Sequence, residues 1–314
     1  MAENTVKKIA TRESYGNSLK ELAEEFPNLV VLDADLAAAT KTGIFRKAYP
    51  DRHIDCGIAE ENMMGVAAGL SLVGKIPFVS SFAMFAAGRA FEQVRNSIGY
   101  PHLNVKIGAT HAGITVGEDG ATHQCNEDIA LMRTIPGMVV MCPSDDVEAR
   151  AAVRAALEYE GPVYIRFGRA AVPVINDHPG YHFEIGKGTV VREGKDVTIV
   201  ATGICVDSAL GAAKLLEEEG ISAEVVNICT IKPLDEQIII NSAKKTGKVV
   251  TVEEHSVIGG LGSAVCDCLC AHYPVPVKKV GMQDVFGESG SAAALVEKYG
   301  LDAKGVYKSV KEFL

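Results

Sequence analysis

The side chains best suited to chemistry gather in one glycine-rich stretch, residues 110–124, which contains His111, Asp119 and His123. Histidine can move protons near neutral pH, and an adjacent carboxylate can orient it or bind a hydroxyl group. The small residues of the stretch would let its backbone approach a ligand. The spacing of the two histidines matches no common metal-ligand pattern, so a metal site is disfavoured. An exposed polar loop with two solvated histidines is the alternative interpretation.

A second candidate is Glu60, which begins a predicted helix at residues 60–72. An acid at a helix start often only complements the helix dipole. Gly65, Ala68 and Gly69 recur along this helix at a spacing that would let another backbone approach closely. A carboxylate at the edge of such a dry contact needs a partner for its charge.

Aromatic and cationic side chains follow two other predicted strands. Phe82 and Phe85 are three residues apart at the start of a predicted helix, a spacing that is typical of core residues. Arg166 and Arg169 follow an apolar strand, where a guanidinium could bind a phosphate bidentately or stay solvated. The glycines of residues 260–262 precede a helix, and we interpret them as packing residues because a lone glycine pair is a weak phosphate motif.

These side chains need a scaffold, and short apolar segments alternating with helical patterns predict one. Strands that alternate with helices indicate βαβ units and a mostly parallel sheet, and ligands usually bind at the carboxyl ends of such strands. In the first part of the chain we predict strands at residues 28–32, 78–79, 105–108, 138–141 and 163–165, and helices at residues 14–26, 60–72, 83–98, 127–134 and 146–159.

The pattern breaks in a turn-rich segment and then resumes. We therefore predict an α/β protein of two domains, residues 1–172 and 191–314, joined by a linker at residues 173–190. Each domain is expected to be a mostly parallel twisted sheet flanked by helices. In the second domain we predict strands at residues 196–201, 223–227, 248–252 and 275–280, and helices at residues 206–219, 235–246 and 261–271.

Composition narrows the function classes. With 314 residues, 47% of them hydrophobic and 23% charged, the chain can bury a sizeable core. Its net charge of −9 argues against nucleic acid or an anionic membrane as the main partner. The sequence has no apolar run of membrane-spanning length, and its start does not resemble a secretory signal. Its eight cysteines follow no disulfide framework, so we expect buried thiols in a reducing cytoplasm.

Three segments, taken together, resemble a known family. Gly-Ile-Ala-Glu at residues 57–60, Ser-Phe-Ala-Met-Phe at residues 81–85 and the Gly-Glu-Asp-Gly-Ala-Thr-His-Gln run at residues 117–124 are similar to the pyrimidine-binding half of transketolase, a thiamine diphosphate enzyme. The resemblance covers essentially the whole chain. It implies a pyrimidine-binding thiamine diphosphate fold in the first domain and a transketolase carboxy-terminal domain in the second.

The resemblance also implies roles for cofactor-binding residues. Glu60 would hydrogen-bond the aminopyrimidine ring of thiamine diphosphate, favour its imino tautomer and so activate the cofactor. Phe82 and Phe85 would stack on or wall the pyrimidine ring. Asp35 matches an acid near the thiazolium ring.

The substrate-binding roles that the resemblance implies fall on five other residues. Asp119 would bind a sugar hydroxyl, while His111 and His123 would line the substrate channel and assist proton transfers. Arg12 and Arg169 match positions where transketolases bind the sugar phosphate. The reaction would transfer a two-carbon ketol unit from a ketose phosphate to an aldose phosphate, as in the pentose phosphate pathway.

The sequence departs from full-length transketolases in three respects. Gly88 replaces a third aromatic residue and Ala39 replaces a phosphate-binding serine, which leaves the exact substrate open. The Gly-Asp-Gly motif that holds the metal and diphosphate is absent from the sequence. The resemblance therefore implies one subunit of a split transketolase. A separate amino-terminal subunit would carry the motif and hold Mg²⁺ or Ca²⁺, and two such pairs would form a heterotetramer, with Gly65, Ala68 and Gly69 in the contact between like chains.

Two alternatives stay open on these residues. The first is another thiamine diphosphate enzyme, similar to deoxyxylulose-phosphate synthase or to the β subunit of a 2-oxo acid dehydrogenase. The second is a non-catalytic assembly subunit that has kept the fold. The presence of Glu60, His111, Asp119 and His123 together disfavours the second alternative, because a purely structural role requires none of them.

Overall fold

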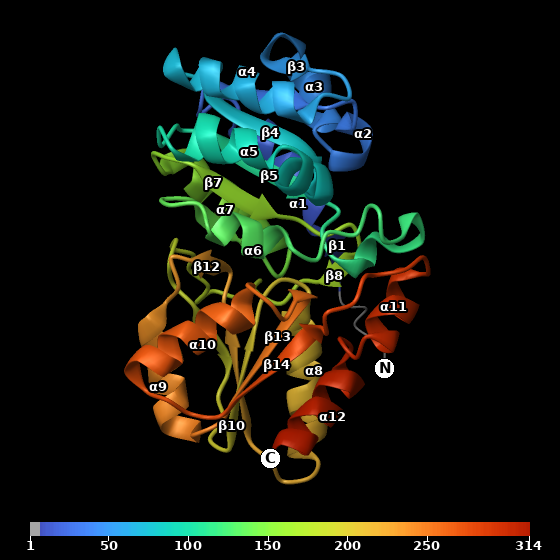
Figure 1. Ribbon diagram of the computed structural model, residues 1–314, viewed down its shortest axis with the longest axis vertical. Coiled ribbons are helices and arrows are strands. Elements are labelled where there is room, and N and C mark those ends of the chain that lie inside the picture. Colours follow the sequence, from blue (N-terminus) through green and yellow to red (C-terminus); the bar gives the residue numbers. More distant parts are fainter. Residues whose placement is uncertain (1–6) are drawn as a thin grey trace.

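The computed structural model describes residues 7–314, and it contains two α/β halves that meet near the middle of the long axis (Figure 1). The first half is built on a seven-stranded sheet in the order β12-β6-β7-β5-β4-β2-β3. Its parallel strands are β2 (Leu29–Asp33), β3 (His53–Asp55), β4 (Ile76–Phe82), β5 (Lys106–Thr110), β6 (Val139–Met141) and β7 (Val163–Arg166). The α/β fold with mostly parallel sheets is confirmed.

Helices cover both faces of this sheet, and the strands read as continuous apolar runs because both faces are buried. Leu32 and Val79 point to the side of α4 and α6, whereas the preceding residues Val31 and Phe78 point to the side of α1 and α7. The helices of this half are α1 (Thr11–Leu22), α2 (Ala37–Thr40), α3 (Gly43–Ala48), α4 (Glu60–Leu72), α5 (Phe91–Gln93), α6 (Asp128–Arg133) and α7 (Asp146–Glu158).

The prediction of a single helix at residues 83–98 is wrong in detail. The segment contains two π-helical turns, Met84–Arg89 and Val94–Gly99, on either side of the short α5. Ala90 N–H donates to Phe85 O, five residues back. Each π turn holds one residue more than an α turn, a change that a hydrophobic periodicity near 3.6 cannot reveal.

The second half contains a five-stranded sheet in the order β14-β13-β10-β11-β9. All of its pairings are parallel except that of β9 with β11. Its strands are β9 (Thr189–Arg192), β10 (Val197–Ala201), β11 (Ala223–Asn227), β13 (Val249–Ser256) and β14 (Val277–Met282). Its helices are α8 (Cys205–Glu217), α9 (Glu236–Thr246), α10 (Leu261–His272), α11 (Ala292–Lys298) and α12 (Ala303–Phe313).

The start of α10 shows what the glycine pair at residues 260–262 does. The buried Glu253 carboxylate accepts hydrogen bonds from the backbone N–H groups of Leu261 (2.7 Å) and Gly262 (2.8 Å). This carboxylate satisfies two of the free N–H groups at the helix start and complements the helix dipole. A side chain on Gly260 would collide with the Glu253 carboxylate and one on Gly262 with Lys279, which confirms the interpretation of these glycines as packing residues.

The two halves are joined by more than the connecting chain. Strand β12 (Thr230–Lys232) belongs to the second half of the sequence but pairs antiparallel with β6 at the edge of the first sheet. The pairing of β1 (Lys8–Ala10) with β8 (Ala171–Pro173), by contrast, lies within the first half. The buried Glu148 of α7 accepts hydrogen bonds from Ser144 (2.7 Å) and from Asn227 of β11 (2.8 Å). The pairing of β12 with β6 and the bond of Asn227 to Glu148 fix the second half against the first.

Within residues 7–314, no helix is long and apolar enough to span a bilayer. All eight cysteines are free thiols, and five of them are buried, namely Cys125, Cys142, Cys205, Cys229 and Cys268.

Candidate active site

The candidate residues gather where parallel strands of the first sheet end. Phe82, the last residue of β4, lies in register with Thr110, the last residue of β5. Helix α4 starts shortly after the edge strand β3, which β2 separates from β4. The register thus places Phe82 beside His111, and the two rings stack with their centroids 3.9 Å apart.

Glu60 is the first residue of α4 and is only 2% exposed. Its Oε2 atom accepts a hydrogen bond of 2.9 Å from Nη1 of Arg89. The guanidinium of Arg89 also lies 4.6 Å from the centre of the Phe85 ring, in a cation–π contact. Arg89 therefore connects the buried carboxylate to the aromatic residues. Arg89 was not among the residues predicted from the sequence, although its position four residues after Phe85 suits a shared helix face.

The aromatic residues form a wall with one polar edge. The rings of Phe82 and Phe85 are nearly parallel, with an interplanar angle of 12° and centroids 5.9 Å apart. His123 meets Phe85 edge-on at 5.4 Å and Phe82 at 6.2 Å. Phe82 is buried while Phe85 is partly exposed, so the pair does more than fill the core.

His111 is held from both sides of its ring. Its Nε2 atom lies 3.0 Å from Nη1 of Arg12, and its Nδ1 atom lies 2.9 Å from Oγ1 of Thr110. Because a guanidinium can only donate, Nε2 must accept, and the ring proton then sits on Nδ1 and is donated to Thr110. Burial, together with the charges of Arg12 and Arg169, lowers the pKa of His111 to about 3. His111 is therefore neutral at physiological pH.

The two arginines predicted to bind phosphate approach the loop of residues 110–124 at different points. Arg12 donates to the Ala39 carbonyl oxygen (3.0 Å) as well as facing His111. Arg169 donates to the carbonyl oxygen of Val116 and pairs with the carboxylate of Glu118 at 3.1 Å. Arg12 thus lies beside the stacked pair of His111 and Phe82, while Arg169 lies beside the middle of the loop.

The two acids predicted as site residues, Asp119 and Asp35, make no hydrogen bond to His111 or Phe82 among the described residues. Asp119 is exposed at the end of the 3-10 stretch Ile114–Asp119, and Asp35 is exposed in a left-handed turn after β2. In the described part of the chain, no hydrogen bond joins either of them to the phenylalanines or histidines. Next to Asp35, the carboxylate of Asp33 is fully buried and accepts from the hydroxyls of Thr40 (2.8 Å) and Thr42 (2.7 Å). Burial raises the pKa of Asp33 to about 6.

The prediction that Arg166 could bind a phosphate is wrong. Its buried guanidinium donates from Nε to both carboxylate oxygens of Asp128 (2.9 and 3.2 Å) and from Nη2 to the backbone oxygen of Glu254 (2.7 Å). Burial alone would lower the pKa of Arg166, but the Asp128 and Glu254 carboxylates raise it well above its ordinary value. The side chain is committed to an internal ion pair.

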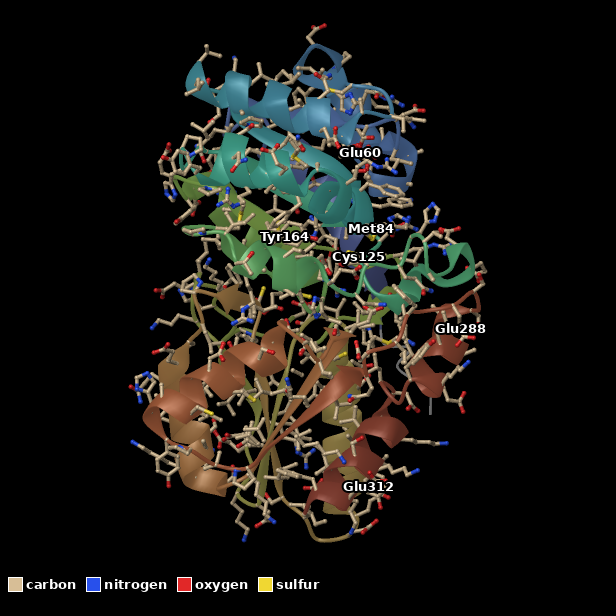
Figure 2. All side chains as sticks on the ribbon, viewed as in Figure 1. Glu60, Met84, Cys125, Tyr164, Glu288 and Glu312 are labelled. Atoms are coloured by element: carbon tan, nitrogen blue, oxygen red, sulfur yellow. The ribbon has the colours of Figure 1, made fainter. Side chains whose placement is uncertain are left out.

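A cavity of about 780 Å³ opens beside this site, between the two halves. Its lining includes Phe85 and Arg89 from the first half and Ser256 and Phe286 from the second. It lies next to the aromatic wall and does not include His111 or Glu60. Figure 2 shows Glu60, Met84 and Cys125 along the side of the first half that leads toward the second. Among residues 7–314, no group of three His, Cys, Asp or Glu side chains lies close enough to hold a metal ion.

Comparisons with known proteins cover nearly the whole chain. Residues 7–174 match the family description "Transketolase, pyrimidine binding domain", and residues 186–306 match "Transketolase, C-terminal domain". The chain is 48% identical over 301 residues to the 6-deoxy-6-sulfo-D-fructose transketolase subunit SqwH of a Clostridium species, covering 96% of this chain and 93% of that subunit. It is 39% identical over 306 residues to one of the apulose-4-phosphate transketolase subunits of Phocaeicola vulgatus, covering 98% of both chains.

One similar solved structure is described as a split gene transketolase, an inactive β4 tetramer. It is 58% identical to this chain, superposes with a TM-score of 0.89 and is covered over 98% of both chains. These relatives are separate subunits of about the same extent as this chain.

Proposed function

This chain belongs to the transketolase family, and we propose that it is the pyrimidine-binding subunit of a split transketolase, which transfers a two-carbon ketol unit from a ketose phosphate to an aldose phosphate. The observation that carries the proposal is the buried Glu60 carboxylate, which lies at a helix start and is linked through Arg89 to an aromatic wall. A structural acid at a helix start needs neither burial nor such a wall.

The residues of this site fit thiamine diphosphate. Only Oε2 of Glu60 receives a side-chain hydrogen bond from the described residues, so Oε1 is available to a nitrogen of the aminopyrimidine ring. The nearly parallel rings of Phe82 and Phe85 suit the face of a flat heterocycle. When bound, the cofactor supplies the nucleophilic carbon that takes up the ketol unit.

Each remaining residue has a role that its surroundings support. Neutral His111 keeps a proton on Nδ1 and a lone pair on Nε2. Because Arg12 and Thr110 occupy these two nitrogens, His111 lines the substrate channel in a fixed tautomer beside Arg12. His123 is half-buried beside Phe85 and assists proton transfer. Arg12 and Arg169 bind the sugar phosphate through their guanidinium groups.

The exposed acids complete the proposed assignment. Asp119 binds a sugar hydroxyl from the surface of the loop, and Asp35 faces the thiazolium end of the cofactor. Names of the related proteins include transketolases for 6-deoxy-6-sulfo-D-fructose and apulose 4-phosphate, so the family accepts several ketoses.

The proposed enzyme requires a second subunit. That subunit carries the Gly-Asp-Gly motif and holds the diphosphate with Mg²⁺ or Ca²⁺. Like chains associate through the first half, where no atom comes within 4 Å of a Cβ placed on Gly65 or Gly69 of α4. Leu72 and Val73 at the end of the same helix are 73% and 74% exposed, a pair of apolar side chains that such a contact would cover. Two pairs form a heterotetramer in the cytoplasm.

The test begins with a tagged pull-down of this chain from its native cells. A stoichiometric partner with a Gly-Asp-Gly motif is the expected result. The pair is then incubated with thiamine diphosphate, Mg²⁺, xylulose 5-phosphate and ribose 5-phosphate. Transfer of two carbons predicts a seven-carbon ketose phosphate and a three-carbon aldose phosphate. Acetyl or deoxyxylulose products from pyruvate would instead favour another thiamine diphosphate chemistry, and an assembled but inactive pair would favour an assembly subunit.

A further inference from the structure

The loop of residues 110–124 rests on the second half of the molecule at a buried carboxylate. Glu254 of β13 is only 3% exposed, and its Oε1 atom accepts a hydrogen bond of 2.7 Å from the backbone N–H of Thr115. The same carboxyl group lies directly against Gly113, leaving no room there for a side chain. A residue of the second half thus contacts the loop between His111 and Asp119.

The first half in turn fixes Glu254. Arg166 donates to the backbone oxygen of Glu254 at 2.7 Å, and its Nη1 atom lies 3.8 Å from Oε2 of the same residue. Arg166 is itself held by Asp128, which also accepts from the hydroxyl of Tyr164 at 2.8 Å. Three buried side chains of the first half therefore determine where the Glu254 carboxylate points.

The far end of the loop has a second anchor on the same half. Nε2 of Gln124 donates to the backbone oxygen of Glu288 (2.8 Å) and lies 3.2 Å from the carbonyl oxygens of both Ile114 and Gly117. Figure 2 shows Glu288 on the segment of the second half that leads into α11, beside the loop. Contacts of Gly120 with Ser289 accompany this anchor.

The loop backbone adopts a conformation that requires such support. His111 has a φ of 56°, in the left-handed region that residues other than glycine rarely occupy. Gly113, Gly117 and Gly120 also have positive φ values. A non-glycine residue in this region persists only where its surroundings hold it. The contacts of Glu254 and Gln124 provide this restraint.

We propose that Glu254 is a positioning residue for the reaction. By accepting the Thr115 N–H, it holds the loop so that His111 stacks on Phe82 and faces Arg12. The second domain, to which no catalytic residue is assigned, thereby sets the geometry of the active site. The catalytic consequence rests on the proposed function, but the positioning of the loop can be measured in this chain alone.

Two conservative variants separate the effect of the side-chain length of Glu254 from the effect of its charge. Glu254→Asp keeps the charge that pairs with Arg166 but shortens the side chain, so the hydrogen bond to Thr115 is lost. Glu254→Gln keeps an oxygen that can accept from Thr115 but loses the charge. Glu148→Asp is the matched control, because Glu148 is a buried glutamate that also joins the two halves but bonds Ser144 and Asn227 and lies outside the loop.

The first readout is hydrogen exchange of the purified chain. We expect Glu254→Asp to speed exchange of the amides of residues 113–117 by on the order of tenfold, as the loss of one buried hydrogen bond predicts. Glu254→Gln should remain near the wild type, and Glu148→Asp should leave these amides unchanged even if its melting temperature falls. The NMR titration of His111 should also move toward its ordinary pKa only in Glu254→Asp, since a loosened loop admits water to the ring.

The second readout is the reconstituted enzyme, in which Glu254→Asp should lower kcat by about tenfold more than Glu148→Asp does. Unchanged loop exchange in Glu254→Asp, or an equal increase in Glu148→Asp, would overturn the inference. Failure of the wild-type pair to transfer a ketol unit would instead contradict the proposed function, while the exchange data would still decide the role of Glu254.

Discussion

Among single residues, the proposed cofactor chemistry depends most on Glu60, which accepts a hydrogen bond from Arg89. Glu60→Gln keeps the size of the side chain but removes the charge and the ability to share a proton with the pyrimidine ring. We expect ketol transfer by the reconstituted pair to fall by about 100-fold or more, as for other acid–base groups, while assembly is retained. Steady-state assays together with size-exclusion chromatography measure both.

The neighbouring Glu61 supplies the control, because it belongs to the same first turn of α4 but is exposed. Glu61→Gln should leave the rate within about twofold of the wild type, since surface charges contribute little. Equal activity of the Glu60 and Glu61 variants would remove Glu60 from the mechanism.

The depressed pKa of His111, about 3, predicts a pH dependence of stability. In the unfolded chain a histidine titrates near 6.5, so between these values the unfolded state binds more protons and the folded state loses stability as the pH falls. At about pH 5.5 this contribution amounts to about 1 kcal/mol. His111→Gln should therefore lose about 1 kcal/mol less than the wild type when the pH is lowered from about 7.5 to 5.5, as measured by urea unfolding.

Asp33 acts with the opposite sign. Its raised folded pKa, about 6, contributes stability that is present below the unfolded value and is lost as the pH rises through about 6. This contribution is common to the wild type and the His111 variant, so it cancels in their comparison. Identical losses of stability in the two proteins would show that His111 is not held neutral by its surroundings.

Residue types in the sequence indicated much of this site, but not its internal contacts. His111, His123, Phe82 and Arg12 do lie together, and loop composition and resemblance were enough to single them out. Arg89 was missed because its partner Glu60 is far away in the sequence. Glu254 was missed because an acid in an apolar strand gives no local sign of the backbone group that it binds.

At the scale of elements, helix α4 combines two functions on one segment. Its first residue faces the aromatic wall, and its outer surface carries Gly65 and Gly69 with open space around them. The acidic start and the small residues at helical spacing predicted this helix correctly, whereas the π turns around α5 escaped prediction. Phe85 and Arg89 both lie in the first of those turns, so the irregular part of the fold carries the aromatic side of the site.

The open surface of α4 gives a prediction about assembly. Gly65→Arg places a long charged side chain in the proposed contact between like chains. The substitution should not harm the isolated helix, because arginine has a higher helix propensity than glycine by up to about 1 kcal/mol. We therefore expect a loss of self-association without a loss of thermal stability, measured by analytical ultracentrifugation and melting curves.

Asn241→Arg is the control for that prediction. It adds the same side chain at an exposed position of α9, in the second half of the molecule. This variant should keep the oligomeric state of the wild type. An unchanged oligomer in Gly65→Arg would place the contact between like chains elsewhere.

At the scale of the whole molecule, the two halves are more closely interlocked than the predicted linker suggests. The strand–helix alternation was sufficient to predict two α/β units. It gave no sign that β12 would cross to the first sheet or that Glu254 would contact the active-site loop. Both are contacts between segments distant in the sequence, and local patterns do not report them.

We propose that this chain supplies one half of an active site and that a partner subunit supplies the other. The most direct measurement is a titration of the partner subunit with this chain, followed by ketol transfer at saturating thiamine diphosphate and Mg²⁺. We predict no significant turnover by either protein alone and a rate that rises linearly until the two are equimolar, then stays constant. Full turnover by this chain alone would contradict the account.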